Sequence, residues 1–440
     1  MAGHRDSERQ VVITGIGVVS PIGIGIDEFW KNLEQGLSGV RETALLPCLP
    51  PNCRIAGEVQ DFNPSTFTKT REQKKAIRVM CREIQLGFAA AALALDHAGI
   101  KDGEIVPDRL GVEFGANLML SPPEDLAEAN AACSDTATHQ FDYSRWGDVG
   151  LGQMFPLWLL KFLPNMPACH IGIAADARGP NNSITLDEAS SNLVIGEALR
   201  VIARGHADMM ITGSTGTRVH AVKSIHAILW DKLAMAEGDP ASACRPFDRT
   251  RAGQVLAEGA ACLILEDARH AQQRGAKVYG RLLGAGSSCV TTQAGNGDLR
   301  RALTLAMKGA IRDAGLAPQD IGHVNAHGLG TVEADYLEAR AIHDVFGEYG
   351  SRVPVTALKS YFGNSAAGCG SLELAGSLVA LGHGVVPPTR NCHNPDPECG
   401  LNVVTGAPLA MKNRTFLKIN VTRMGQASAV VVEGAGERGT

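Results

Sequence analysis

Glu188 begins a segment rich in alanine and glycine whose pattern predicts a helix over residues 188–207, EASSNLVIGEALRVIARGHA. A negative charge in the first turn of a helix is stabilised by about 0.3–1 kcal/mol, and a carboxylate can act as a general base. Three further polar side chains lie in glycine-containing segments, namely His327 in NAHGLGT and both Lys359 and Asn364 in LKSYFGNSAAG. These side chains are far apart in sequence, so the fold has to position them.

The elements around these residues occur twice along the chain. Residues 91–100 (AALALDHAGI) and 308–316 (KGAIRDAGL) each predict an amphipathic helix with a glycine stop, followed by a buried strand. The predicted helix over 188–207 has a counterpart in 364–384, which also ends in a Gly-His step. The chain therefore consists of two copies of one unit, and the first copy is longer by a surplus around residues 117–175.

Repeated strand and helix units with buried apolar strands predict a layered α/β architecture with helices on both sheet faces. The expected boundaries are a polar tail (1–10), a first half (11–267) with the insertion at 117–175, a second half (268–435) and a second tail (436–440). No linker rich in Pro, Gly or Ser separates the halves, so they are expected to share one core.

Several ordered motifs in register give the chain a family resemblance. They are VVITGIGVVSPIG (11–23), RPFDRTRAGQVLAEGAACLILED (245–267), NAHGLGT (325–331), LKSYFGNSAAG (358–368) and VPPTRN (386–391). With these motifs the chain resembles the elongating β-ketoacyl-acyl carrier protein synthases of fatty-acid and polyketide synthesis, including their non-condensing chain-length factors. The resemblance implies a thiolase-type fold of five layers, αβαβα, whose first half carries the pocket and the dimer insertion.

The resemblance also assigns site positions. Glu188 stands where the family carries its acylated cysteine, and a carboxylate cannot form that thioester. His327 matches the first catalytic histidine and Lys359 the lysine near it, whereas Asn364 stands where elongating enzymes carry a second histidine. We expect Glu188 to be ionised and to pair with His327 or Lys359.

The family's C-terminal glycine-rich loop, which carries a gating aromatic residue, corresponds here to TRMGQAS (422–428). Met424 replaces the aromatic gate, Arg423 precedes it, and Gly425 follows in the same loop, a candidate for the oxyanion hole. The inferred fold makes Arg423 a further candidate partner for Glu188.

Three functions remain open. The preferred hypothesis is a non-condensing subunit, similar to a chain-length factor, that pairs with an active ketosynthase. The second is a decarboxylase of malonyl-acyl carrier protein that uses His327 and Asn364 to stabilise the enolate. The third is an acyltransferase or hydrolase in which Glu188 is the general base. Either a homodimer or a heterodimer is compatible with the sequence.

A basic segment, TKTREQKKAIR, resembles the family surface that receives the acidic acyl carrier protein. Its candidate docking residues are Lys69, Arg71, Lys74 and Lys75. A charge run of this kind is also typical of a solvated helix face.

Composition limits the other partners and the location of the protein. The net charge of −5 gives no cationic field that would attract nucleic acid. The apolar segment 154–166 (MFPLWLLKFLPNM) is interrupted by Pro156, Lys161 and Pro164 and is too short to span a bilayer. The eleven cysteines contain no CxxC pair, and no cluster has the spacing of metal ligands. We therefore expect a reduced, cytoplasmic protein without metal or cofactor.

Overall fold

The computed structural model describes residues 9–101, 104–236 and 238–436. The strands of this part are β1 (Val11–Ser20), β2 (Gly23–Ile24), β3 (Val40–Glu42), β4 (Ile55–Gly57), β5 (Leu110–Gly115), β6 (Asn181–Ile184), β7 (Met209–Thr217), β8 (Leu256–Asp267), β9 (Gly280–Cys289), β10 (His323–Asn325), β11 (Pro354–Thr356), β12 (Val385–Val386), β13 (Asn402–Val403), β14 (Leu409–Ala410), β15 (Thr415–Val421) and β16 (Gln426–Gly434). The main path through the mixed sheet runs β13, β11, β10, β15, β16, β9, β1, β8, β7, β5, β6. β12 pairs with β14 in a separate ribbon.

The strand pairing confirms the duplication. In the first half β1 and β8 are antiparallel, β8 and β7 are antiparallel, and β7, β5 and β6 are parallel. The second half repeats this pattern with β9, β16, β15, β10 and β11 in the same roles. Antiparallel pairing of β1 with β9 joins the halves, so they share one continuous structure, as expected.

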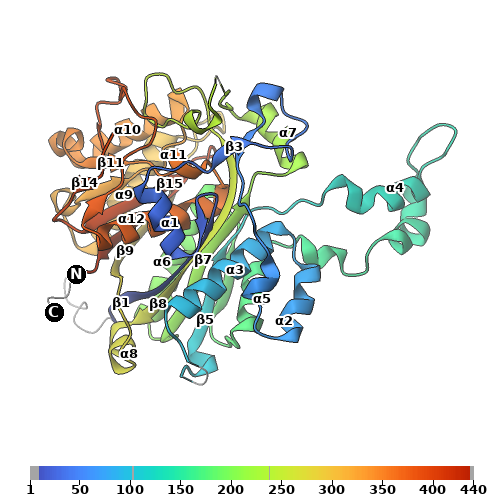
Figure 1. Cartoon of the computed structure of the whole chain (residues 1–440), viewed down its shortest axis with the longest axis horizontal. Helices are drawn as coiled ribbons and strands as arrows, with labels where there is room; N and C mark the ends of the chain where they lie inside the picture. Colours follow the sequence, from blue (N-terminus) through green and yellow to red (C-terminus); the bar gives the residue numbers. More distant parts are fainter. Residues whose placement is uncertain (1–8, 102–103, 237, 437–440) are drawn as a thin grey trace.

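Helices cover both faces of each half. They are α1 (Ile26–Glu34), α2 (Arg71–Ala76), α3 (Arg82–His97), α4 (Ala127–Cys133), α5 (Met166–Ala174), α6 (Ser190–Ala203), α7 (Ala221–Trp230), α8 (Ala268–Gln273), α9 (Leu299–Ala314), α10 (Val332–Phe346), α11 (Lys359–Phe362) and α12 (Cys369–Gly382). α6 and α12 contact each other and strands of both halves, while α3 and α5 cover one outer face and α9 and α10 the other (Figure 1). This is the five-layer thiolase-type arrangement that the family resemblance implies.

Small side chains allow the two central helices to approach closely. A Cβ atom added to Gly370 of α12 would lie 2.6 Å from the Cβ of Ser191 in α6. Gly196 of α6 is in a similar position, because an added Cβ would lie 2.8 Å from that of Ala285 in β9. Such distances are shorter than van der Waals contact, so larger residues would force the layers apart.

The predicted glycine stops are present, whereas the helix starts differ from the prediction. α3 is followed by Gly99 (φ 64°) and α9 by Gly315 (φ 71°), both in the left-handed region that favours glycine. α6 begins at Ser190, not at 188, because residues Asp187–Ala189 form a 3-10 turn called η11. α12 begins at Cys369 after an equivalent turn, η15 (Ala366–Gly368).

Between β5 and β6 the chain leaves the body as a projecting arm that includes α4 (Figure 1). Large apolar side chains of this arm are exposed, among them Tyr143 (84%), Leu151 (55%) and Leu159 (57%). The arm therefore presents apolar side chains to solvent. Within the described residues, no helix combines the length and the apolar character that crossing a membrane requires.

Candidate functional site

Glu188 lies in η11, directly before the central helix α6, and only 5% of the residue is exposed. The turn is fixed locally, because the Leu186 backbone amide donates a hydrogen bond to the hydroxyl of Ser190. Asp187 has a positive φ of 48° within this turn. The backbone therefore directs the Glu188 side chain into the interior between the two halves.

Glu188 is held by two donors. Its Oε1 atom accepts hydrogen bonds from Nη2 of Arg218 at 2.8 Å and from Nδ2 of Asn364 at 3.0 Å. Arg218 also binds Asp231 through Nη1 at 3.0 Å. Asn364 donates a second hydrogen bond to Oε1 of Gln254 at 2.6 Å. Its side-chain amide therefore donates hydrogen bonds to two side chains of the protein, Glu188 and Gln254.

These contacts correct the expected partners of Glu188. Lys359 forms its ion pair with Glu373 at 2.6 Å, and the guanidinium of Arg423 lies 5.3 Å from the ring centroid of Trp230. The cation beside Glu188 is Arg218, which sequence reasoning missed. Arg218 directly follows β7, at the carboxyl end of a buried strand, and this position is the signal that could have identified it.

Arg218 remains charged although its surroundings are buried. Burial lowers the pKa of Arg218, but the carboxylates of Glu188, Asp187 and Asp231 raise it above the usual value for arginine. Asp187 supplies the third carboxylate, with Oδ1 3.9 Å from Nη2 of Arg218. The guanidinium thus concentrates positive charge at a point where three acidic side chains meet.

His327 follows β10 in a loop that α10 secures, since Glu338 accepts hydrogen bonds from the backbone amides of His327 and Gly328. Its Nδ1 atom lies 3.3 Å from Nζ of Lys359 and 3.2 Å from Nδ2 of Asn420. Burial and then the charge of Lys359 lower the pKa of His327 well below its usual value. Both neighbours are donors, so Nδ1 accepts and the neutral ring carries its proton on Nε2.

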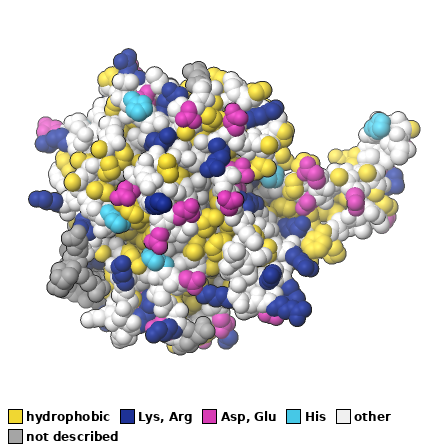
Figure 2. Space-filling model, in the orientation of Figure 1, with side chains coloured by type: hydrophobic (Ala, Val, Ile, Leu, Met, Phe, Trp, Pro, Cys, Tyr) yellow, Lys and Arg dark blue, Asp and Glu magenta, His cyan; other side chains and the backbone are white. Residues whose placement is uncertain are grey.

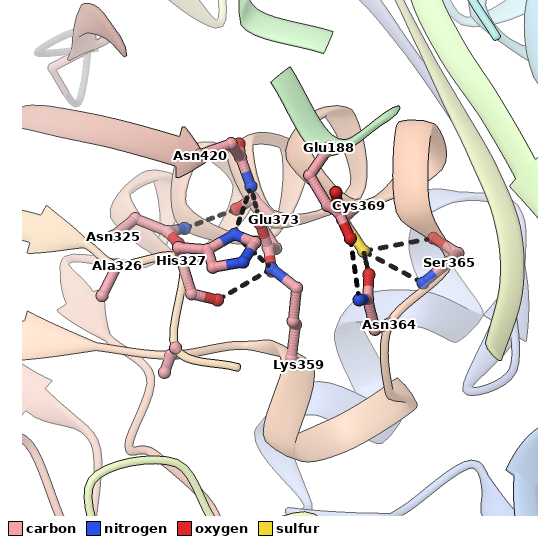
Figure 3. A network of polar contacts seen from close by, with 12 residues as sticks. Glu188, Asn325, Ala326, His327, Lys359, Asn364, Ser365, Cys369, Glu373 and Asn420 are labelled. Atoms are coloured by element: carbon pink, nitrogen blue, oxygen red, sulfur yellow. Dashed lines mark hydrogen bonds and ion pairs between the residues drawn. The ribbon is translucent and has the colours of Figure 1, made fainter. Parts of the chain in front are cut away.

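A buried ion network supports His327 from α12 (Figure 3). Glu373 binds Nζ of Lys359 through one oxygen and Nζ of Lys418 through the other, each at 2.6 Å. Lys359 also donates to the backbone carbonyl of His327 at 2.7 Å. Burial lowers the pKa of Lys418 to about 8. Sequence reasoning missed both Glu373 and Lys418.

Cys369, the first residue of α12, lies beside Asn364 and Glu188 (Figure 3). Its sulfur is 3.1 Å from Oδ1 of Asn364 and accepts the backbone amide of Ser365 at 3.0 Å. The residue is fully buried, and burial is the main reason why the pKa of its thiol is raised to about 11. It is therefore a protonated, structural thiol.

The loop with Arg423, Met424 and Gly425 is the tight turn between β15 and β16. Gly425 has φ 78° and donates its amide to the carbonyl of Thr422 at 3.0 Å. Met424 is 47% exposed, and Arg423 stacks outward on Trp230 at the end of α7. The structure therefore places this turn beside α7, and its expected role as gate and oxyanion hole stays a prediction.

The four basic candidates for carrier docking lie on α2 and just before it. Lys69, Arg71, Lys74 and Lys75 are all exposed, and basic side chains gather on this part of the surface (Figure 2). The helix is fixed by reciprocal hydrogen bonds between Thr70 and Gln73. Lys69 forms an ion pair with Asp96 at 2.6 Å, but both side chains are exposed, so this pair adds little stability.

Known proteins share both the sequence and the fold of this chain. It is 32% identical over 410 residues to 3-oxoacyl-(acyl-carrier-protein) synthase 2 of Synechocystis sp., covering 92% of this chain and 93% of the relative. The protein of the same name from Coxiella burnetii is 33% identical over 416 residues, covering 93% and 95%.

Two solved structures are similar over nearly all of the chain. One is a type II polyketide synthase acyl-carrier protein in complex with its ketosynthase, with a TM-score of 0.84, 25% identity and coverage of 98% of this chain and 100% of the other. The other is the ishigamide ketosynthase/chain length factor, with a TM-score of 0.83, 26% identity and the same coverage. In addition, residues 8–271 match the family model of the β-ketoacyl synthase N-terminal domain, and residues 279–393 match that of the C-terminal domain. The chain therefore belongs to the β-ketoacyl synthase family.

Proposed function

We propose that this protein is a non-condensing ketosynthase-like subunit that pairs with an active ketosynthase in the synthesis of fatty-acyl or polyketide chains. The observation that carries the proposal is the buried Glu188, whose carboxylate is held by Arg218 and Asn364. In the family resemblance this is the position of the acyl-accepting cysteine. A carboxylate tied to an arginine has no thiol to form a thioester.

The contacts of Asn364 support a loss of catalysis. An enolate or oxyanion needs donors that are free to bind it. Asn364 donates the two N–H groups of its amide to Glu188 and Gln254. Neither N–H group is therefore available to an enolate unless the pocket rearranges. His327 retains an Nε2 proton, but a single donor does not provide the pair that the decarboxylation hypothesis requires.

Electrostatics support the same conclusion. A malonyl group would have to bring its own carboxylate to the place that Glu188 occupies, and like charges at short range repel strongly in a buried site. The cation that could neutralise an incoming carboxylate, Arg218, is already shared by Glu188 and Asp231. Decarboxylation is for this reason a weaker hypothesis than an interaction role.

The surface of the protein fits a subunit. The projecting arm exposes apolar side chains that a partner would cover, and α2 presents lysine and arginine side chains that suit an acidic carrier protein. The similar structures include a ketosynthase/chain length factor and a ketosynthase in complex with a carrier protein. We therefore include an active ketosynthase and an acyl carrier protein among the proposed partners.

A second function, condensation by this chain itself, is favoured by the names of the curated relatives, which are 3-oxoacyl-(acyl-carrier-protein) synthases. Intact-protein mass spectrometry distinguishes the two functions after incubation with acyl-carrier protein and malonyl-carrier protein. We expect no acyl adduct on this chain, and we expect the product pattern of a co-expressed ketosynthase to depend on it. A covalent acyl adduct that turns over into a β-ketoacyl product would refute the subunit role. Cys369→Ser provides the control for acylation of the neighbouring thiol.

A further inference from the structure

A groove lies at one end of the sheet, where four strands bring a row of side chains together. Val12 of β1 is in register with Arg281 of β9, and Arg281 is in register with Glu433 of β16. Glu433 in turn is in register with Thr415, the first residue of β15. These four residues line the groove, whose volume is about 560 Å³. Sites for small molecules commonly have volumes of about 300–1,000 Å³, so the groove is large enough for a small ligand.

This groove is separate from the site around Glu188. Thr415 begins β15 at the groove, and Asn420 near the other end of the same strand contacts His327. The strand rises about 3.3 Å per residue, so Thr415 and Asn420 lie roughly 17 Å apart. A small ligand in the groove therefore has contacts of its own and does not share those of the polar site.

The segment before β15 adds two cations to the groove. Lys412 is exposed and Arg414 is half-buried, and both side chains line the groove. Nη1 of Arg414 donates hydrogen bonds to the backbone carbonyls of Leu381 in α12 and Ala435 after β16. These carbonyls orient the guanidinium but leave it without a carboxylate. Within the part of the chain that the structure describes, neither Lys412 nor Arg414 forms an ion pair.

Among the described lining residues, Glu433 is the one carboxylate. Its Oε2 atom accepts hydrogen bonds from Nε and Nη2 of Arg281 at 3.2 and 2.8 Å. The two side chains are 41% and 42% exposed, so their ion pair is hydrated and weak, and Arg281 can also bind a ligand. With Arg281, Lys412 and Arg414 facing this one carboxylate, the groove keeps a formal charge of +2.

We propose that this groove binds a phosphate group carried by a small molecule. A phosphate monoester has a charge of about −1.5 to −2 at neutral pH, which balances the charge of the groove, whereas a carboxylate balances only half of it. A guanidinium binds two phosphate oxygens at once, and an ammonium group adds a point charge. The inference goes beyond the proposed function and does not depend on it, because the groove lies away from Glu188.

The experiment is isothermal titration calorimetry on the full chain at constant ionic strength. Inorganic phosphate is the probe, and acetate is the carboxylate control. Two substitutions change the charge of the groove in opposite directions, since Lys412→Ala removes a positive charge and Glu433→Gln removes the negative one. Lys308→Ala and Glu333→Gln, at exposed positions of α9 and α10, are the matched controls.

We expect the wild type to bind phosphate more tightly than acetate. Lys412→Ala should weaken phosphate binding about threefold to tenfold, and Glu433→Gln should strengthen it by a similar factor, because each changes the charge that faces the ligand. The two control variants should bind phosphate as the wild type does. Co-sedimentation with vesicles that contain phosphatidic acid, if Lys412→Ala abolishes it, would identify a lipid headgroup as the source of the phosphate; otherwise the source is a soluble molecule.

Three results would overturn the inference. They are the absence of any heat of binding at millimolar phosphate, acetate bound as tightly as phosphate, and a phosphate affinity that neither groove substitution changes. None of these measurements involves an acyl adduct or a partner ketosynthase. Failure of the inference is therefore distinguishable from failure of the proposed function.

Discussion

The two central helices begin in the same way but with different chemistry. Each follows a 3-10 turn, η11 before α6 and η15 before α12. The first turn carries the carboxylate of Glu188, whereas α12 begins with the thiol of Cys369, and Asn364 contacts both groups. The start of α6 thus carries a carboxylate in its preceding turn, whereas the start of α12 carries a neutral thiol on the first residue of the helix.

The helix dipole alone does not explain this difference. A helix start favours a negative charge by about 0.3–1 kcal/mol. The rise in the pKa of Cys369 from 9.0 to about 11 corresponds to about 3 kcal/mol against the thiolate, and burial is its largest cause. Burial therefore prevails at α12. At α6 the carboxylate of Glu188 has Arg218 as a direct partner. This ion pair, which the thiol of Cys369 lacks, is the main difference between the two helix starts.

Removing Arg218 should have the largest effect on this comparison. In Arg218→Met, Glu188 would remain in the interior without its cation, and we expect the free energy of unfolding to fall by about 2–4 kcal/mol, since part of Arg218 reaches solvent. Urea denaturation measures the change. The double variant Glu188→Gln/Arg218→Met should recover part of the loss. Equal stability of the single and double variants would show that the ion pair is not what holds Glu188.

In the second half the charged side chains are almost fully buried, with Glu373 between Lys359 and Lys418. The pH dependence of stability tests this difference between the halves. Burial lowers the pKa of Lys418 to about 8, so above pH 8 the folded protein loses a proton that the unfolded chain retains up to about 10.5. Through Lys418, stability should therefore rise with pH between 8 and 10.5.

The variant Lys418→Met should flatten this rise, by about 1–3 kcal/mol across the window. Urea denaturation at several pH values provides the measurement, and Lys74→Met on the exposed face of α2 is the control. If the slope of stability against pH is the same in Lys418→Met and in the wild type, Lys418 is not the titrating group.

Much of this site could be predicted from the sequence, because the motifs around Glu188, His327, Lys359 and Asn364 occupy fixed positions in a duplicated α/β unit. The structure brings His327 close to Lys359 and Glu188 close to Asn364. The duplication was also visible, since helix periodicity and glycine stops depend on local sequence. The roles of these residues remain predictions.

The pairing of charges was not predictable in the same way. Arg218, Glu373 and Lys418 come from a strand end, a helix and a strand that meet only in the folded chain. Lys418 lies within TFLKINV, where an isolated lysine gives no sign that it is fully buried. Arg423, in contrast, was a plausible partner for Glu188 from its motif, but the β15–β16 turn directs it to Trp230. Side-chain direction at a tight turn depends on backbone angles that sequence spacing does not give.

Neutralising Glu188 would make the start of α6 resemble that of α12. Glu188→Gln retains an oxygen that can accept from Arg218 but removes the charge that repels a malonyl carboxylate. We expect a loss of about 1–2 kcal/mol in stability and at least a tenfold gain in decarboxylation of malonyl-carrier protein, measured as acetyl product by mass spectrometry. If the wild type has a hydrolase activity that Glu188→Gln abolishes, Glu188 is instead a general base.

The smallest effect is expected at Cys369. Because its thiol is neutral and fully buried, Cys369→Ser should change the free energy of unfolding by about 1 kcal/mol and leave the product pattern of a partner ketosynthase unchanged. Peptide mapping after iodoacetamide treatment should find the exposed Cys48 and Cys289 alkylated in the native protein and Cys369 alkylated only after unfolding. Rapid native labelling of Cys369 would mean that a thiolate is available beside Glu188, and the neutral description of the α12 start would be wrong.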